Sequence, residues 1–200
     1  TIEQAINRHP ADYYLQLLKA TTQMQTNPPH KDLLRTVNTA LFLAPNYSMT
    51  HLQAARALWQ LNFRSQAYLE YRKAILVNPV NFPNIAAEVF SKNKNYRDML
   101  QLAGPNMDTQ LMVAQWFKEQ GQLKMALQVL NDQLEDNFRI WRMRCEIQKD
   151  VGDYPAALSS AKKLRELYPF SHYGYYWASL VFTQLGQWEN SVEVLDQTNE

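Results

Sequence analysis

The sequence has 200 residues, of which 20 are Lys or Arg and 19 are Asp or Glu, so its net charge is +1. A balance this even excludes the basic footprint of proteins that bind nucleic acid or an anionic membrane surface. The single cysteine, Cys145, excludes an intrachain disulfide framework and a cysteine-based metal cluster, and the sequence contains no run of about 18 apolar residues that would insert into a membrane.

Glycine is scarce, with five residues in the whole sequence. Because glycine costs about 1 kcal/mol relative to alanine inside a helix, its scarcity favours an all-helical chain. The sequence opens and closes within helical patterns, so we expect it to be a fragment of a longer chain. A chain without disulfides can reside in a reducing or an oxidising space, and a cytoplasmic and a bacterial periplasmic location therefore both stay open.

Prolines recur at a nearly constant interval in the first half of the sequence. Pro10, Pro45 and Pro79 are almost equally spaced, and each of them comes five positions after an alanine. A small residue lets two helices approach closely, and proline ends a helix because it cannot continue the hydrogen-bond ladder. The interval therefore predicts a solenoid whose repeating unit is a pair of helices of about 34 residues.

Taken in chain order, each unit has apolar residues at helical spacing on both sides of a polar or small turn, which predicts two amphipathic helices. The unit from 80 to 105 is the shortest, and we expect it to bend or loosen the stack. The predicted turns lie at 27–29, 61–63 and 92–95, and at Gly121, Gly152 and Gly186. The predicted organisation is a single domain, 1–200, made of a half unit, 1–10, and the units 11–45, 46–79, 80–105, 106–136, 137–169 and 170–200.

Two stretches near the end of the sequence match each other most closely. The segments at 152–154, Gly-Asp-Tyr, and at 186–188, Gly-Gln-Trp, are the same small–polar–aromatic turn, one repeat length apart. Around them the sequence resembles the tetratricopeptide repeat, which has aromatic residues near its fourth and seventeenth positions, small residues near the eighth and twentieth, glycine near the fifteenth and proline at the thirty-second. The matching residues are Trp141, Cys145, Gly152, Tyr154, Ala157 and Pro169 in one unit, and Tyr175, Ser179, Gly186, Trp188 and Ser191 in the next.

This resemblance covers nearly the whole chain and implies an all-α fold, a right-handed superhelical solenoid of antiparallel helix pairs. It also implies that the first helix of each pair lines the concave face, where proteins of this architecture bind their ligands. Trp141 and Trp188 occupy packing positions of the repeat, so we expect both to be structural. The Lys and Asn of the family's carboxylate clamp are absent at the matching positions, and binding of chaperone tails is therefore not expected.

Residues with catalytic or metal-binding potential are scattered. His9, His30, His51 and His172 have no partner at ligand spacing, and His51 is expected to pack between helices. Cys145 falls on a small buried position and is expected to be an inert thiol. The adjacent Glu135 and Asp136 point to different helix faces and are expected at a helix end. Because no phosphate-binding loop or nucleophile motif occurs either, we predict that the chain is not an enzyme and has no cofactor and no metal.

Arginine and aromatic residues gather at positions that the resemblance places on the concave face. Such side chains supply most binding hot spots, so they favour a peptide segment as ligand, although they could also form a solvated surface. The candidate partner-binding residues are Arg56, Trp59, Arg139, Arg142, Glu146, Tyr173, Tyr176 and Trp177.

Two functions are compatible with these features. The first is a non-catalytic scaffold for protein–protein interaction that binds a peptide or protein segment in the concave groove, with no nucleic acid as partner and with its oligomeric state left open. The alternative comes from residues 7–18, NRHPADYYLQLL, which are similar to a region that follows the membrane spans of bacterial O-antigen ligase or polymerase-like proteins. Under that resemblance the chain is a periplasmic tail with a regulatory or assembly role in a larger membrane protein.

Overall fold

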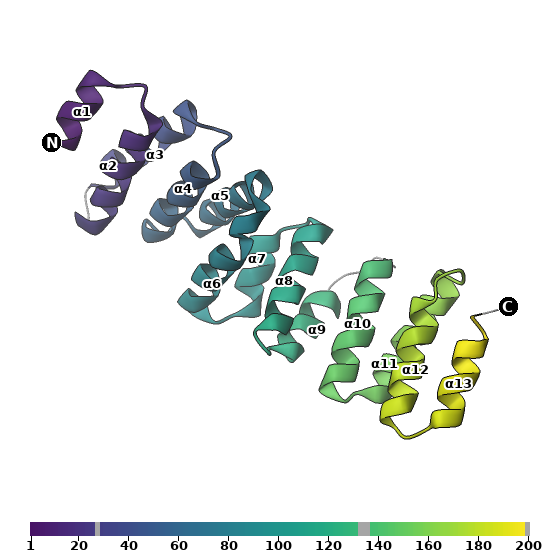
Figure 1. Ribbon diagram of the computed structural model, residues 1–200. Helices are drawn as coiled ribbons and strands as arrows, with labels where there is room; N and C mark the ends of the chain where they lie inside the picture. The colour runs from purple at the N-terminus through teal and green to yellow at the C-terminus, as the bar shows by residue number, and fades with distance from the viewer. Residues whose placement is uncertain (27–28, 132–136, 199–200) are drawn as a thin grey trace. The chain divides into compact units, whose positions relative to one another are not determined.

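The computed structural model describes residues 1–26, 29–131 and 137–198, and every regular element in these ranges is helical. By its internal contacts the chain divides into two compact units, Thr1–Gly104 and Pro105–Glu200 (Figure 1). Within the described ranges, no helix is both long enough and apolar enough to cross a membrane. The all-α fold is therefore as predicted, and the two units are described one at a time.

The first unit consists of helices that pack in sequence order as antiparallel neighbours. Helix α2 contacts α3, α3 contacts α4, α4 contacts α5 and α6 contacts α7, while α2 also touches α4. The first helices of two successive pairs therefore lie side by side, as a solenoid requires. The helices are α1 (Ile2–Arg8), α2 (Tyr13–Thr26), α3 (His30–Leu43), α4 (Ser48–Gln60), α5 (Arg64–Val77), the 3-10 turn η1 (Pro79–Asn81), α6 (Phe82–Asn93) and α7 (Tyr96–Ala103).

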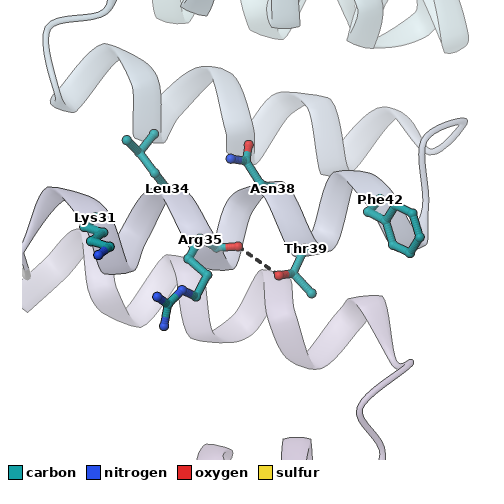
Figure 2. A pocket seen from close by; sticks show the side chains of 6 residues that line it. All are labelled: Lys31, Leu34, Arg35, Asn38, Thr39 and Phe42. Carbon is teal, nitrogen blue, oxygen red and sulfur yellow. Dashed lines mark hydrogen bonds between the residues drawn. The ribbon is translucent and has the colours of Figure 1, made fainter.

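Small side chains set the spacing of helices in this unit. Ala20, Ala54 and Ala57 are fully buried together with Leu33 and Val37, and all five form one core cluster. Alanine has no side chain beyond Cβ, so the backbones approach closely while the leucine and valine fill the remaining space. The opposite side of α3 is left open and carries an exposed stripe that ends at Phe42 (Figure 2).

The second unit repeats the arrangement. Neighbouring helices again pack in sequence order, and α10 also contacts α12, so first helices stack here too. A buried cluster in this unit takes one residue from each of four successive helices, Cys145, Ala161, Ala178 and Val194. The helices are α8 (Met107–Glu119), α9 (Leu123–Asn131), α10 (Phe138–Val151), α11 (Tyr154–Leu167), α12 (Tyr173–Gln184) and α13 (Trp188–Asp196).

Four of the described turns between paired helices share one backbone conformation. In each of these four, a residue shortly after the first helix has a positive φ, which is 65° at Asn62, 70° at Gly121, 84° at Gly152 and 72° at Gly186. This left-handed conformation is open to glycine and tolerated by asparagine, because other residues clash there through Cβ. The predicted turns at 61–63, Gly121, Gly152 and Gly186 are thus present. The turn at 92–95 closes at Lys94, whose φ is 49°, whereas Asn27 and Pro28 of the first predicted turn lie outside the described residues.

The irregular unit 80–105 has shorter helices than the unit formed by α10 and α11. Helix α6 has 12 residues and α7 has 8, against 14 each in α10 and α11. Gly104, with φ of 64°, ends α7 where an added Cβ would lie 2.8 Å from the Arg72 side chain. Because the Arg72 side chain could move away, the positive φ is what explains why glycine stands there. That all the units form a single domain stays a prediction.

One packing prediction is wrong. Trp188 begins α13 with 64% of its surface exposed, although its position in the repeat is a packing position. The residue faces outward because α13 is the last described helix, and nothing among the described residues covers that side of it. Trp141, by contrast, is half-buried as expected, with the Arg144 guanidinium 4.5 Å from its ring centroid.

Candidate functional site

In the second unit, ion pairs join the first helices of successive pairs. Lys118 of α8 pairs with Glu146 of α10, and Arg139 of α10 pairs with Asp108 of α8. The predicted site residues Arg139 and Glu146 therefore contact the neighbouring first helix. Both are neutralised within the protein, so neither offers a free charge to a partner.

Between α10 and α12 the contacts change from ion pairs to cations over aromatic rings. The Arg142 guanidinium lies 5.7 Å from the ring centroid of Tyr173, and the Lys149 ammonium lies 6.0 Å from that of Trp177. Cations at this distance from an aromatic face are attracted by its quadrupole. The structure thus brings the predicted residues Arg142 and Tyr173 together, and it adds Lys149, which the sequence selection missed.

Arg142 differs from the other predicted charged residues. It is exposed, and no carboxylate of the described residues lies within salt-bridge distance of it. Tyr173 and Tyr176 are three residues apart on α12 and therefore lie on one side of that helix. Tyr176 is 45% exposed. This surface presents an uncompensated cation next to two tyrosines, and we call Arg142, Tyr173 and Tyr176 the arginine–tyrosine patch.

Trp177, selected from the sequence as a partner-binding residue, also packs against the core of the second unit. Its indole packs against the core cluster of Cys145, Ala161, Ala178 and Val194, and it meets the Tyr176 ring edge-to-face with centroids 5.4 Å apart. The indole Nε1 is buried without a hydrogen-bond partner among the described residues. Trp177 thus links the patch to the core and holds Tyr176 at the surface.

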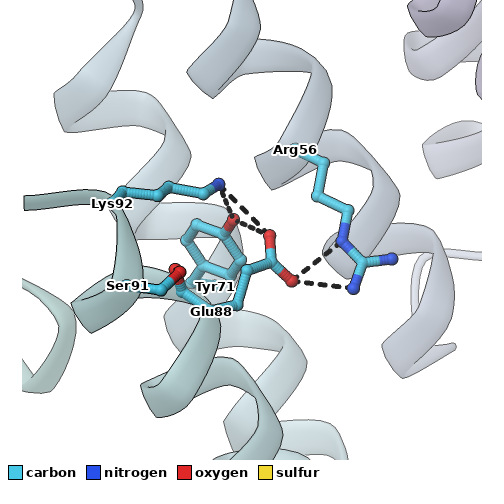
Figure 3. Close-up of polar contacts among 5 residues, drawn as sticks. All are labelled: Arg56, Tyr71, Glu88, Ser91 and Lys92. Atoms are coloured by element: carbon cyan, nitrogen blue, oxygen red, sulfur yellow. Dashed lines mark hydrogen bonds and ion pairs between the residues drawn. The ribbon is translucent and has the colours of Figure 1, made fainter.

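In the first unit, Arg56 belongs to an internal network (Figure 3). Its Nε and Nη2 donate to Glu88 Oε2 at 3.0 and 2.7 Å, while the Tyr71 hydroxyl donates to Glu88 Oε1 at 2.7 Å. Lys92 completes the cluster, with Nζ 3.2 Å from both Glu88 Oε1 and the Tyr71 hydroxyl. The network ties α4, α5 and α6 together, so Arg56 is already engaged.

The charges of this network are reflected in its pKa values. Burial alone would raise the pKa of Glu88, but hydrogen bonds from Arg56 and Tyr71 outweigh it and lower that pKa. Burial, together with the hydrogen bond to Glu88, raises the pKa of Tyr71 far above its usual range. Burial lowers the pKa of Lys92. The carboxylate is therefore the charged centre that the surrounding donors stabilise.

Trp59 packs against the second helix of its own pair. Its ring meets Tyr68 and Tyr71 of α5 edge-to-face, with centroids 5.5 and 6.5 Å away. The Arg64 guanidinium and the Lys92 ammonium lie 4.0 and 4.6 Å from its centroid. Two of the predicted residues, Arg56 and Trp59, therefore stabilise the first unit. Glu88 follows Arg56 in the sequence by close to one repeat length, and that spacing was the signal by which it could have been found.

An apolar groove of about 240 Å³ lies between the first helices α2 and α4. The candidate residues selected from the sequence do not include it, although two of its lining residues, Tyr14 and Leu18, are 64% and 41% exposed. The groove is lined by Tyr14, Leu17, Leu18, Thr21, Tyr47, Met49 and Gln53.

His51 and Cys145 are structural, as expected. The His51 ring is buried, with Nδ1 2.6 Å from Glu70 Oε2 and Nε2 2.7 Å from the Pro45 carbonyl oxygen. Burial raises the pKa of Cys145 to about 12, so its thiol stays protonated and unreactive. The ranges that the structure describes contain no group of three or more His, Cys, Asp or Glu side chains arranged to hold a metal. Glu135 and Asp136 lie outside these ranges.

Solved structures with a similar fold were found, whereas neither a protein-family model nor a curated protein matches the sequence. One is YrrB, described as a TPR protein with an unusual peptide-binding site. Its sequence is 17% identical, the aligned region covers 99% of this chain and 90% of the YrrB chain, and the TM-score is 0.45. PilW, a type IV pilus biogenesis factor, is 16% identical over 91% of this chain and 90% of its own, with a TM-score of 0.45. A third match is a chain of the APC/C hetero-tetramer Cut9–Hcn1, with 11% sequence identity. The aligned region covers 98% of the present chain and 41% of the matched chain, with a TM-score of 0.45.

Proposed function

We propose that this chain, an all-α protein of tetratricopeptide-type helix pairs, is a non-catalytic scaffold that binds a segment of another protein along its first helices. The partner contact is assigned to the arginine–tyrosine patch on α10 and α12. The other residues selected from the sequence hold neighbouring helices together. They are Arg139, Glu146 and Trp177 in the second unit and Arg56 and Trp59 in the first.

The observation that carries this proposal is the isolation of Arg142. Arg56 and Arg139 each have a carboxylate partner on a neighbouring first helix, whereas Arg142 lies near the ring of Tyr173 and has no carboxylate partner among the described residues. A guanidinium whose neighbour is an aromatic ring and not a carboxylate keeps its N–H groups available, so it can bind a planar acceptor such as a carboxylate.

The chemistry of the patch sets the chemistry of the partner. A carboxylate of the partner would accept from Arg142, and an apolar side chain next to it would lie against Tyr176. The ordering cost is small, because each tyrosine has only two side-chain torsions and Trp177 already packs against Tyr176. We therefore propose an acidic residue flanked by an apolar one as the recognised element.

The test is a selection from a displayed library of random peptides on the immobilised protein. Peptides enriched by the wild type should carry an acidic residue beside an apolar one, and fluorescence anisotropy should give an affinity for a synthetic copy. Since a hot-spot arginine or tyrosine costs about 2 kcal/mol or more when truncated, Arg142→Ala with Tyr176→Ala should weaken binding by roughly tenfold or more.

A matched control is Arg139→Ala, which removes an arginine of the same helix that already has a carboxylate partner. Its affinity for the peptide should change little. If the double variant binds as tightly as the wild type, the patch is not the binding site. The alternative of a periplasmic tail in a larger membrane protein receives no support from the fold or from the comparisons, and we do not propose it.

A further inference from the structure

The apolar groove between α2 and α4 shares no residue with the arginine–tyrosine patch, and we call it the α2–α4 groove. Its two helices contact each other directly, so both walls of the groove belong to described helices of the first unit. None of the residues that line it carries a charge. The groove is therefore a second surface with a chemistry of its own.

Large apolar side chains are exposed together in this groove. Tyr14 and Leu18 of α2 are joined there by Tyr47 and Met49, which are 44% and 36% exposed. A single exposed apolar side chain needs no explanation, but several that share one concave surface indicate a place where another molecule binds. The walls thus favour an apolar ligand.

Leu18 shows that the open packing is particular to this groove. Leu52 stands one repeat length later, at the same position of the next first helix, and is only 7% exposed. Leu111 on the first helix α8 is likewise buried. Packing therefore covers a leucine on α4 and on α8, whereas it leaves Leu18 accessible on α2.

The charged residues that flank the groove along its helices are neutralised within the protein. Lys19, next to Leu18 in the sequence, pairs with Glu3 at 2.9 Å. Arg56, one turn after Gln53 on α4, pairs with Glu88 at 2.7 Å. A charged ligand group would lose its water here without gaining an opposite charge, which is costly. The surroundings therefore favour an uncharged ligand group.

Gln53 adds one polar atom without a partner to the wall of the groove. Its Oε1 is buried and has no hydrogen-bond donor among the described residues. A buried acceptor that has lost its water and gained no donor destabilises the folded state. The last side-chain torsion of glutamine is broad, so the amide can turn and bring Oε1 towards the groove. A ligand with an N–H group would then supply the missing donor.

We propose that the α2–α4 groove binds one large uncharged apolar side chain of a protein segment, while a main-chain N–H of that segment donates to Gln53 Oε1. The volume of about 240 Å³ is below the roughly 300–1,000 Å³ that hold a drug-sized molecule, and it suits a single side chain such as leucine. A protein segment carries an N–H beside every such side chain, whereas a lipid acyl chain carries none. The inference rests on the proposed function only in taking a protein segment as the ligand.

NMR of the full chain with ¹³C-labelled methionine methyl groups tests this site, with the tripeptide acetyl-Ala-Leu-Ala-amide as the probe. The Met49 signal, identified among the seven methionines by its loss in Met49→Leu, should shift and saturate as the tripeptide is added. The same tripeptide with aspartate in place of leucine should bind roughly tenfold more weakly, because it places a charge in an apolar groove. A Met49 signal that does not respond to the leucine tripeptide overturns the proposal.

Two leucine variants locate the binding. Leu18→Glu places a charge in the groove and should weaken binding of the leucine tripeptide by roughly tenfold or more. Leu69→Glu is the matched control, because Leu69 is 49% exposed on α5 and lies outside the groove. Its affinity should equal that of the wild type, as should that of Arg142→Ala/Tyr176→Ala. The groove and the arginine–tyrosine patch can thus fail independently.

Gln53→Leu separates a ligand contact from a structural role. It removes the unpaired acceptor, so the midpoint of chemical denaturation should rise, while loss of the hydrogen bond should weaken binding of the leucine tripeptide about three- to tenfold. Gln23→Leu removes another buried, unpaired Oε1 on α2, outside the groove. It should raise the midpoint as well but leave the affinity unchanged. Binding to Gln53→Leu that is as tight as to the wild type, or tighter, overturns the proposed hydrogen bond and is the result expected for an acyl-chain site.

Discussion

Gly152 and Gly186, one repeat length apart in the sequence, close their turns with the same two hydrogen bonds. The amide of Gly152 donates to the Lys149 carbonyl at 3.0 Å, and that of Gly186 donates to the Thr183 carbonyl at 3.1 Å. In both turns the next amide reaches the carbonyl five residues before it, at 2.9 Å. The same pattern of backbone hydrogen bonds therefore recurs in both units. A glycine in the left-handed conformation allows the backbone to form it.

This relationship predicts the cost of replacing the glycine. An added Cβ at Gly152 meets nothing within 4 Å, so its only penalty is the positive φ. Gly152→Ala should therefore lower the free energy of unfolding by about 1–2 kcal/mol, measured by chemical denaturation. Gly152→Asn should cost less, because asparagine tolerates this conformation and Asn62 adopts it in the equivalent turn. Equal losses for both variants would contradict a backbone origin.

Close packing in the second unit predicts the effect of a larger side chain. Ala157 is fully buried on α11, at a position where the repeat requires a small residue. Ala157→Leu should destabilise the fold by about 1–3 kcal/mol, because the helices must move apart to admit it. Ser159→Leu, at an exposed position of the same helix, is the matched control and should leave the melting temperature nearly unchanged. An unchanged melting temperature for Ala157→Leu would show that the assigned register is incorrect.

The Glu88 network predicts a dependence of stability on pH. The folded protein has a Glu88 pKa below the usual value of 4.5, so ionised Glu88 contributes stability above that pH. The contribution is lost as the pH falls through the lowered pKa of the folded state. Glu88→Gln should therefore be less stable than the wild type near neutral pH, and the two melting temperatures should converge in acid. The exposed Glu166→Gln is the control, and its melting temperature should track the wild type at every pH.

Replacing the exposed Trp188 should cost much less folding free energy than replacing a buried tryptophan. Since 64% of its surface is accessible, Trp188→Gln should change the free energy of unfolding by less than about 0.5 kcal/mol. Trp116, which is 7% exposed, should cost about 3–5 kcal/mol when truncated to alanine. A large loss of stability at Trp188 would mean that its side chain is covered in solution.

The helix pairs were predictable because their signals are local. A proline that ends a helix, or a glycine or asparagine that adopts a positive φ, acts within a few residues, so the turns at Asn62, Gly121, Gly152 and Gly186 could be placed from spacing alone. The buried position of Cys145 followed from the same register.

The site was predicted only in part, because it depends on distances between helices. Sequence spacing placed Arg56, Arg139 and Arg142 on first helices, but it did not indicate that two of them have a carboxylate within reach and the third has a ring. Those outcomes depend on how far neighbouring backbones lie apart and on side-chain length. The prediction that Trp188 is a packing residue was wrong for a related reason, since a packing position is buried only if another element lies against it.

The central claim, that a protein segment binds across α10 and α12 at the arginine–tyrosine patch, is tested most directly by NMR titration. The selected peptide would be added to isotope-labelled protein and shifts followed residue by residue. The account predicts the largest changes at Arg142, Tyr173 and Tyr176, with the indole signal of Trp177 moving as well. Changes that leave these residues untouched and gather on α3 or α13 instead would contradict it.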